Sequence, residues 1–333
     1  MIWLTWRQHR KQALYTAIAL VALAAVMLPT GLSMHHVFTK SGLAACLKTV
    51  PTAEVISANA NTCDTLSSQF SRQFSSMGFI AILFLIVPVL VGLFYGAPLV
   101  AREVEHGTHR FVWTQGVSRR RWAATKFGLI GAVTLILSAA YTLGMDWWSG
   151  PLTAEGGRLD PIIFDFEGIV PIGYTLFAVA LGVFVGTVSK KVLPAMGVTL
   201  AGFPVVRVLI EIFARPRYQG LQAASFPITS NDQFNGASGA WTSGQGIVNA
   251  TGKLVQPNSF MTCNVPAGSP APGTGSCDNQ LLKQGLGPAP FSNWEQYQPA
   301  SRFWEFQGIE TGIFLALAAI LLYLALRRIR RIS

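Results

Sequence analysis

Few residues in this chain of 333 have the types and spacing that catalysis or ligand binding needs. The sequence contains no G-x-x-x-x-G-K-[ST] segment, the phosphate-binding loop with which many proteins bind and hydrolyse ATP. His106 and His109 lack the H-E-x-x-H arrangement of zinc proteases, so we interpret them as surface residues. His35 and His36 are adjacent, and the sequence around them offers no ligand partner. We therefore expect no catalytic residue and no metal site, and predict that the chain is not an enzyme.

Three ionisable residues lie in or beside apolar segments, where a charge costs about 2.5–3.5 kcal/mol on membrane-insertion scales. Arg207 and Glu211 are four residues apart, so on a helix they share a face and can pair. Glu310 is a third member of this group. These residues either pair structurally near the membrane surface or line a transport pathway, and both interpretations stay open. Pro88 kinks the middle of an apolar segment and is a further pathway candidate, or a packed kink without function.

The composition places these residues in a membrane protein. Hydrophobic residues make up 51% of the chain and charged residues 12%, whereas soluble domains have about 25% charged residues. The mean hydropathy is +0.42, and several apolar runs approach the ~20 residues that cross a bilayer as a helix. We predict an all-α integral membrane protein with six transmembrane helices, at residues 13–32, 77–100, 127–148, 168–188, 192–213 and 307–326.

The distribution of charge predicts the orientation of these helices. Fifteen of the 25 Lys and Arg residues fall within 7–11, 102–126, 190–191 and 327–331, together with just two acidic residues. Because inner loops are enriched in basic residues, these segments and both termini are expected to be cytoplasmic. The net charge of +10 then reflects orientation and contact with anionic lipids rather than nucleic-acid binding.

The segments between the predicted helices have distinct compositions. Residues 1–12, with Trp3 and Trp6, are expected to form an interfacial elbow helix, or simply an anchor for the first span. Residues 101–126 form a cytoplasmic loop and 327–333 a basic tail. The predicted extracytoplasmic segments are 33–76, 149–167 and 214–306.

All four cysteines fall in the predicted extracytoplasmic segments, where oxidising conditions favour disulfides. Cys46–Cys63 and Cys263–Cys277 are the natural local pairs, and cross-pairing stays an alternative. Residues 214–306 are dense in Gly, Pro, Ser, Asn and Gln. We expect them to form a disulfide-containing cap between the fifth and sixth helices, one that gates or receives a substrate.

The loop 101–126 carries local signals of two helix ends. Gly107 suits the left-handed conformation that follows many helices, and Ser118 can cap the next helix. Glu103 and Glu105 lie at a helix C-terminus, where acids are unfavourable unless a basic partner or another helix N-terminus accepts them.

The same loop resembles the loop after the second helix of ABC-2 type transporter permeases. The resemblance rests on Arg102-Glu103, Gly107-Thr108, Val117-Ser118-Arg119 and Lys126. In that family the loop is the coupling element that contacts a separate ATPase. Glu103 is the first candidate for a residue that contacts the ATPase. An ordinary positively charged inner loop is the alternative. The coupling residues implied by the resemblance are Arg102, Glu103, Glu105, Gly107, Thr108, Ser118, Arg119 and Lys126.

The resemblance implies the permease subunit of an exporter in a bacterial inner or plasma membrane. It implies a second permease copy, so that the permease is a homodimer, and two ATPase subunits that bind ATP and Mg²⁺; this chain would hold no cofactor. The few charges in the spans favour an amphipathic or hydrophobic substrate such as a drug, lipid or peptide. The alternatives are a six-span channel, an ion-coupled carrier or a membrane assembly factor, and more remotely an intramembrane enzyme.

Overall fold

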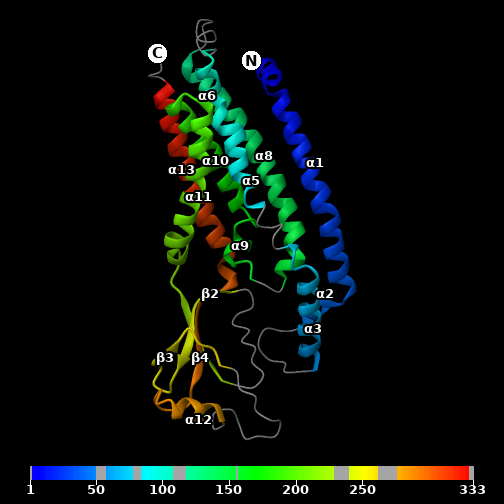
Figure 1. Cartoon of the computed structure of the whole chain (residues 1–333), viewed down its shortest axis with the longest axis vertical. Helices are drawn as coiled ribbons and strands as arrows, with labels where there is room; N and C mark the ends of the chain where they lie inside the picture. The colour runs from blue at the N-terminus through cyan, green and yellow to red at the C-terminus, as the bar shows by residue number, and fades with distance from the viewer. Residues whose placement is uncertain are drawn as a thin grey trace. The chain divides into compact units, whose positions relative to one another are not determined.

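The computed structural model describes residues 2–49, 58–77, 84–107, 118–154, 157–228, 240–261 and 276–329, and is mostly helical (Figure 1). Among these residues, six helices are long and apolar enough to cross a membrane, in agreement with the predicted number. They are Ile18–Lys40, Val87–Glu105, Arg121–Thr153, Val170–Ser189, Val192–Arg217 and Ala300–Ile329.

The chain divides into two compact units. The first unit falls within residues 1–82 and 143–155, and the second within 83–142 and 156–333.

In the first unit, α1 (Ile2–Lys40) is one continuous helix of 39 residues. The predicted elbow helix at 1–12 and span at 13–32 therefore lie within one helix, and the boundary between them stays a prediction. At 1.5 Å per residue α1 is about 60 Å long, roughly twice the hydrocarbon thickness of a bilayer. Hydropathy located the apolar part, but the polar ends continue the same helix because their residues also favour helical backbone.

The last turns of α8 (Arg119–Thr153) pack against α1 within this unit. The indole Nε1 of Trp148 donates to Thr30 Oγ1 over 2.9 Å, and the His35 ring stacks on Trp147 at 5.1 Å between centroids. Gly31 permits this approach, since a Cβ there would lie 2.6 Å from the Trp147 ring. The aromatic pair is thus a helix–helix contact, and Trp148 is fully buried.

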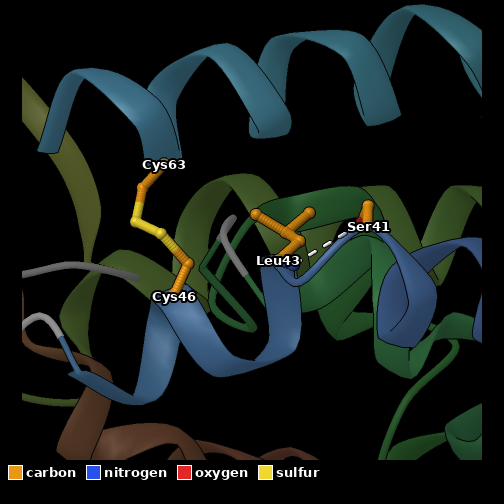
Figure 2. Close-up of a disulfide and its surroundings, with 4 residues drawn as sticks. All are labelled: Ser41, Leu43, Cys46 and Cys63. Atoms are coloured by element: carbon orange, nitrogen blue, oxygen red, sulfur yellow. Dashed lines mark hydrogen bonds between the residues drawn. A yellow bond between two sulfur atoms is a disulfide. The ribbon is translucent and has the colours of Figure 1, made fainter. Parts of the chain in front are cut away.

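Two shorter helices follow α1 in the first unit. Cys46 of α2 (Leu43–Thr49) and Cys63 of α3 (Ala58–Gln73) form a disulfide with their Cα atoms 5.8 Å apart, as Figure 2 shows. Beside it, the Leu43 amide donates to Ser41 Oγ over 3.4 Å. Of the other expected pair, Cys263–Cys277, Cys263 lies outside the residues described.

In the second unit, α10 (Val170–Ser189) is the central helix and runs beside α13 (Phe303–Ile329) (Figure 1). Of the residues in its most apolar 18-residue stretch, 67% are buried, against 17% in the corresponding stretch of the fifth span. That fifth span consists of α11 (Val192–Leu209), the π-helix η2 (Ile210–Ala214) and the 3-10 turn η3 (Arg215–Arg217).

Aromatic side chains fill the space around α10. Tyr174 and Phe177 lie with their ring centroids 4.7 and 5.3 Å from Phe314 of α13, and each lies 6.1 Å from Phe203 of α11. All four rings are buried. This core joins the fourth, fifth and sixth spans.

The second span consists of α5 (Val87–Val91), the π-helix η1 (Gly92–Gly96) and α6 (Ala97–Glu105). Pro88 lies in the first turn of α5, where a proline needs no hydrogen-bond partner. The apolar helix among the described residues begins at Val87. Since residues 78–83 lie outside those described, a kink at Pro88 within a span over 77–100 stays a prediction.

Glycines bring this second span into backbone contact with α10. A Cβ at Gly92 would lie 2.6 Å from the Ala178 carbonyl, and one at Gly96 2.5 Å from Val179 O. From the other side, a Cβ at Gly182 would lie 2.6 Å from Ala97 N, and one at Gly186 2.7 Å from Ala97 O. Two glycine pairs spaced four residues apart thus face each other.

Residues 222–298 include a four-stranded antiparallel sheet, so the prediction of an all-α fold is wrong. Its order is β1-β4-β2-β3. Ile228, Ile247, Leu281 and Phe291 form its core. Polar residues on both faces of β4 hid the alternation that reveals strands. The remaining elements are β1 (Gln222–Pro227), β2 (Trp241–Val248), β3 (Leu254–Pro257), β4 (Ser292–Gln298), α9 (Pro161–Phe164), α12 (Ser276–Lys283) and η4 (Ala300–Arg302).

Gly182→Ala should destabilise the protein by about 1–3 kcal/mol, because the added methyl group would meet backbone atoms that cannot move aside. The midpoint of thermal unfolding in detergent should fall. Gly131→Ala on α8 is the matched control, since a Cβ there would meet open space among the described atoms. Equal midpoints for Gly182→Ala and the wild-type protein would contradict the close helix contact.

Glu295 of β4 predicts a pH dependence of the sheet. Burial raises the pKa of its carboxyl above the ordinary value of 4.5, and a hydrogen bond with Thr242 offsets this in part. The folded state therefore binds the proton more tightly, so the stabilisation is full below pH 4.5 and is lost as pH rises through the raised pKa. Glu295→Gln should remove this loss. Hydrogen exchange of the β4 peptide should be slower in the variant than in wild type at pH 7, with little difference at pH 4.

Candidate functional site

One end of the second unit collects the basic residues of three separate segments, and we call it the basic end. Arg102, Arg121, Lys190, Lys191, Arg327 and Arg328 are all exposed there. The end is held together by a core that includes Val100 of α6, Trp122 of α8, Val183 of α10 and Ile329 of α13. The loop 101–126 thus starts and ends at this surface.

The helix before this loop ends, and the helix after it begins, as their residue types predicted. Gly107 follows α6 with φ of +71°, the left-handed conformation that glycine adopts without strain. Ser118 Oγ accepts a hydrogen bond from Arg121 N over 3.3 Å at the start of α8. Thr108, also implied as a coupling residue, lies outside the residues described.

Glu103 of α6 forms an ion pair with Lys126 of α8. Both side chains are largely buried, at 18% and 12% exposed, and Lys126 Nζ also lies 4.9 Å from the Trp122 ring centroid. The pair fixes the two arms of the loop against each other. Glu103 therefore faces inward, while Arg102 and His106 are exposed beside it and Arg119 is partly exposed.

Glu105 bonds to the start of α11 instead of to α8. Its Oε2 accepts a hydrogen bond from Val192 N over 2.9 Å, although the two residues are 87 positions apart. Val192 is the first residue of α11, and the preceding Lys191 supplies no side-chain cap. An acid is unfavourable at the C-terminus of its own helix, but here it lies at the positive N-terminus of another. Such a cap stabilises a helix by about 1 kcal/mol.

At the opposite end of the unit lies a buried group of four charged side chains and one tyrosine, which we call the charge cluster: Asp165, Tyr174, Arg207, Arg215 and Glu310. Asp165 follows α9, Tyr174 is on α10, Arg207 and Arg215 are on the fifth span, and Glu310 is on α13. All are buried except Arg207, which is 17% exposed.

Arg215 is at the centre of the cluster. Its Nη2 donates to Asp165 Oδ1 over 2.5 Å and to Glu310 Oε1 over 2.7 Å, and its Nε donates to Glu310 Oε2 over 2.9 Å. The Tyr174 hydroxyl lies 2.8 Å from Asp165 and 2.6 Å from Glu310. Two cations and two carboxylates balance, as buried charges require.

Arg207 forms its ion pair with Asp165, rather than with Glu211 as its helical spacing had suggested. Spacing along one helix identifies neighbours on that helix but carries no information about another segment. Of the pathway candidates, the structure brings Arg207 and Glu310 into one cluster through Asp165 and Arg215. Glu211 acts on this group electrostatically without a direct ion pair among the described contacts.

Sequence reasoning missed Asp165, Tyr174 and Arg215. Arg215 lies two residues past the predicted end of the fifth span, and Asp165 was placed in a polar loop. The usable signal was that the fifth apolar segment is followed closely by an arginine, while the loop before the fourth segment carries acidic residues. In the part of the chain described, no three His, Cys, Asp or Glu side chains are grouped to hold a metal ion.

Arg215→Met should destabilise the protein by about 3–5 kcal/mol, because Asp165 and Glu310 would lose the cation that both contact. The double variant Arg215→Met with Glu310→Met keeps the Arg207–Asp165 pair and restores charge balance. It should therefore be less destabilised than the sum of the two single variants, as a double-mutant thermal-unfolding cycle in detergent would measure.

Arg217→Met is the matched control, since Arg217 is exposed in the same 3-10 turn and bonds to the Phe213 carbonyl. It should change stability by less than about 0.5 kcal/mol. Additive effects of Arg215→Met and Glu310→Met would contradict a shared network.

Comparison with known proteins identifies the family of the chain. A family model described as ABC-2 membrane transporter related matches residues 17–215, more than half of the chain. No curated protein and no solved structure gives a significant match. The matched segment includes the loop 101–126, Asp165, Arg207 and Arg215, and ends before the sheet. The chain is therefore a multi-pass membrane protein that belongs to the ABC-2 membrane transporter related family.

Proposed function

We propose that the chain is the permease subunit of an exporter driven by a separate ATPase, which docks at the basic end. The observation that carries this proposal is the geometry of the loop between α6 and α8. Both of its arms are fixed by the Glu103–Lys126 pair, and its exposed cations surround the two helix ends. A rigidly anchored charged loop suits a surface that receives displacement from a soluble partner.

The orientation is part of the same proposal. Six exposed basic residues lie together at the basic end, and basic residues are enriched on the cytoplasmic side of membranes. An ATPase that uses cytoplasmic ATP would therefore meet this end. The sheet would be extracytoplasmic and would form the cap that receives or releases substrate. The disulfide-linked α2 and α3 would be extracytoplasmic as well. The membrane would be the bacterial inner or plasma membrane.

The assembly is proposed to contain two permease copies and two ATPase subunits, which would bind ATP and Mg²⁺. The fifth span supports a second copy, because 17% of the residues in its most apolar 18-residue stretch are buried within its own chain. Leu193, Val205 and Phe213 on this span are all more than half exposed. Such a face meets lipid or another helix. The substrate would be amphipathic or hydrophobic, such as a drug, lipid or peptide.

Purification of the tagged protein in mild detergent, followed by mass spectrometry, tests the proposal. A stoichiometric ATPase with a phosphate-binding loop should co-purify. The double variant Arg102→Glu with Arg121→Glu should lower its yield about tenfold or more, because reversed charges at an interface cost several kcal/mol.

The matched control is Arg217→Glu, which reverses an exposed charge at the opposite end of the unit. It should leave the ATPase yield unchanged. Recovery of the protein without an ATPase at every detergent strength would overturn the proposal and favour a channel, a carrier or an assembly factor.

A further inference from the structure

We propose that Glu105 couples the second span to the fifth, so that displacement of the loop after α6 moves α11. This inference rests on the proposed function, because it assigns a route by which motion at the loop reaches another span. Glu105 is a positioning residue in this proposal. It acts through its hydrogen bond to the first amide of α11 and contacts no substrate.

The contact lies where the two helices can transmit a force. Glu105 is the last residue of α6 and directly precedes the exposed segment that begins with His106 and Gly107. Val192 is the first residue of α11. A displacement of the loop is therefore applied to α6 within one residue of the bond that holds α11.

Small residues bring the helices together just below this bond. Ala97 and Ala101 of α6 and Ala195 of α11 are completely buried in one cluster. On α10, a Cβ at Gly186 would lie 2.7 Å from Ala97 O. Such contacts bring the backbones of these helices close together. Glu105 lies one turn beyond Ala101, so its bond to α11 continues this contact at the helix ends.

The connection between α10 and α11 cannot take up the motion by bending. It consists of Lys190 and Lys191, and Lys190 has φ of +56°, which is uncommon for a residue with a side chain. Ser189 Oγ donates to Lys191 O over 3.0 Å and closes the turn. Glycine contacts also hold α10 against the second span. As a result, α6, α10 and the start of α11 are held together.

The negative charge of Glu105 makes the bond specific to this pair of helices. The carboxylate lies at the end of α6, whose exposed carbonyl groups repel it, and at the start of α11, whose exposed amides attract it. The acid is therefore favoured while the two ends stay together. This accounts for an acidic residue at a helix C-terminus within a basic surface.

The first experiment measures the mechanical link in the permease itself. Ile136 of α8 and Val198 of α11 are exposed, so the variants Ile136→Cys and Val198→Cys can carry nitroxide labels. Pulsed electron paramagnetic resonance should give a narrow distribution of distances between the two labels in the otherwise unchanged protein. Glu105→Ala should lose the narrow peak, and Glu105→Gln should be intermediate, because it keeps an acceptor oxygen without the charge.

Asp160→Ala is the matched control. Asp160 is also an acidic N-cap in this unit, accepting from Ile162 N and Ile163 N, but the helix it caps is α9 and the bonds are local. It should leave the narrow peak unchanged. A Glu105→Ala distribution as narrow as that of the wild type would overturn the proposal, as would equal broadening by Asp160→Ala.

The second experiment uses the complex with the co-purified ATPase, trapped with ATP and vanadate. Trapping should shift the distance between the two labels in the wild type, and Glu105→Ala should lose this shift while retaining the bound ATPase. An unchanged shift in Glu105→Ala would overturn the inference. If no ATPase is recovered, the proposed function fails, but the first experiment still tests the link.

Discussion

A balanced group of buried charges holds together the most tightly packed part of this protein. Arg215 bridges Asp165 and Glu310, and Arg207 pairs with Asp165, so that the fifth span, the sixth span and the segment after α9 meet around Tyr174. Each charge would be costly on its own in an apolar environment. Together they require that these segments stay in one arrangement.

The cluster also explains the form of the fifth span. The helix changes from α to π at Ile210 and to a 3-10 turn at Arg215. Ile212 and Phe213 are exposed, whereas Arg215 is buried. A change of helix type alters which face follows, and here it accompanies a change from lipid-facing residues to a buried cation.

The two ends of the second unit are therefore built from different interactions. At the basic end, glycine and alanine contacts bring backbones together, and single polar bonds from Glu103 and Glu105 fix the helix ends. At the opposite end, aromatic packing and the charge cluster join three spans.

Much about this protein could be predicted from its sequence, because some constraints act along a single segment. A bilayer requires about 20 apolar residues per helix, and topology depends on the basic residues of each loop, so six spans and the grouping of basic segments were readable. The conformation of Gly107 and the cap at Ser118 are local and could be predicted as well.

The tertiary structure decided which distant residues meet. Asp165 and Glu310 are far apart in the chain, as are Glu105 and Val192, and the pattern around each is compatible with many partners. The sheet was likewise missed because its strands carry polar residues on both faces, so it depends on pairing between segments rather than on a pattern within one.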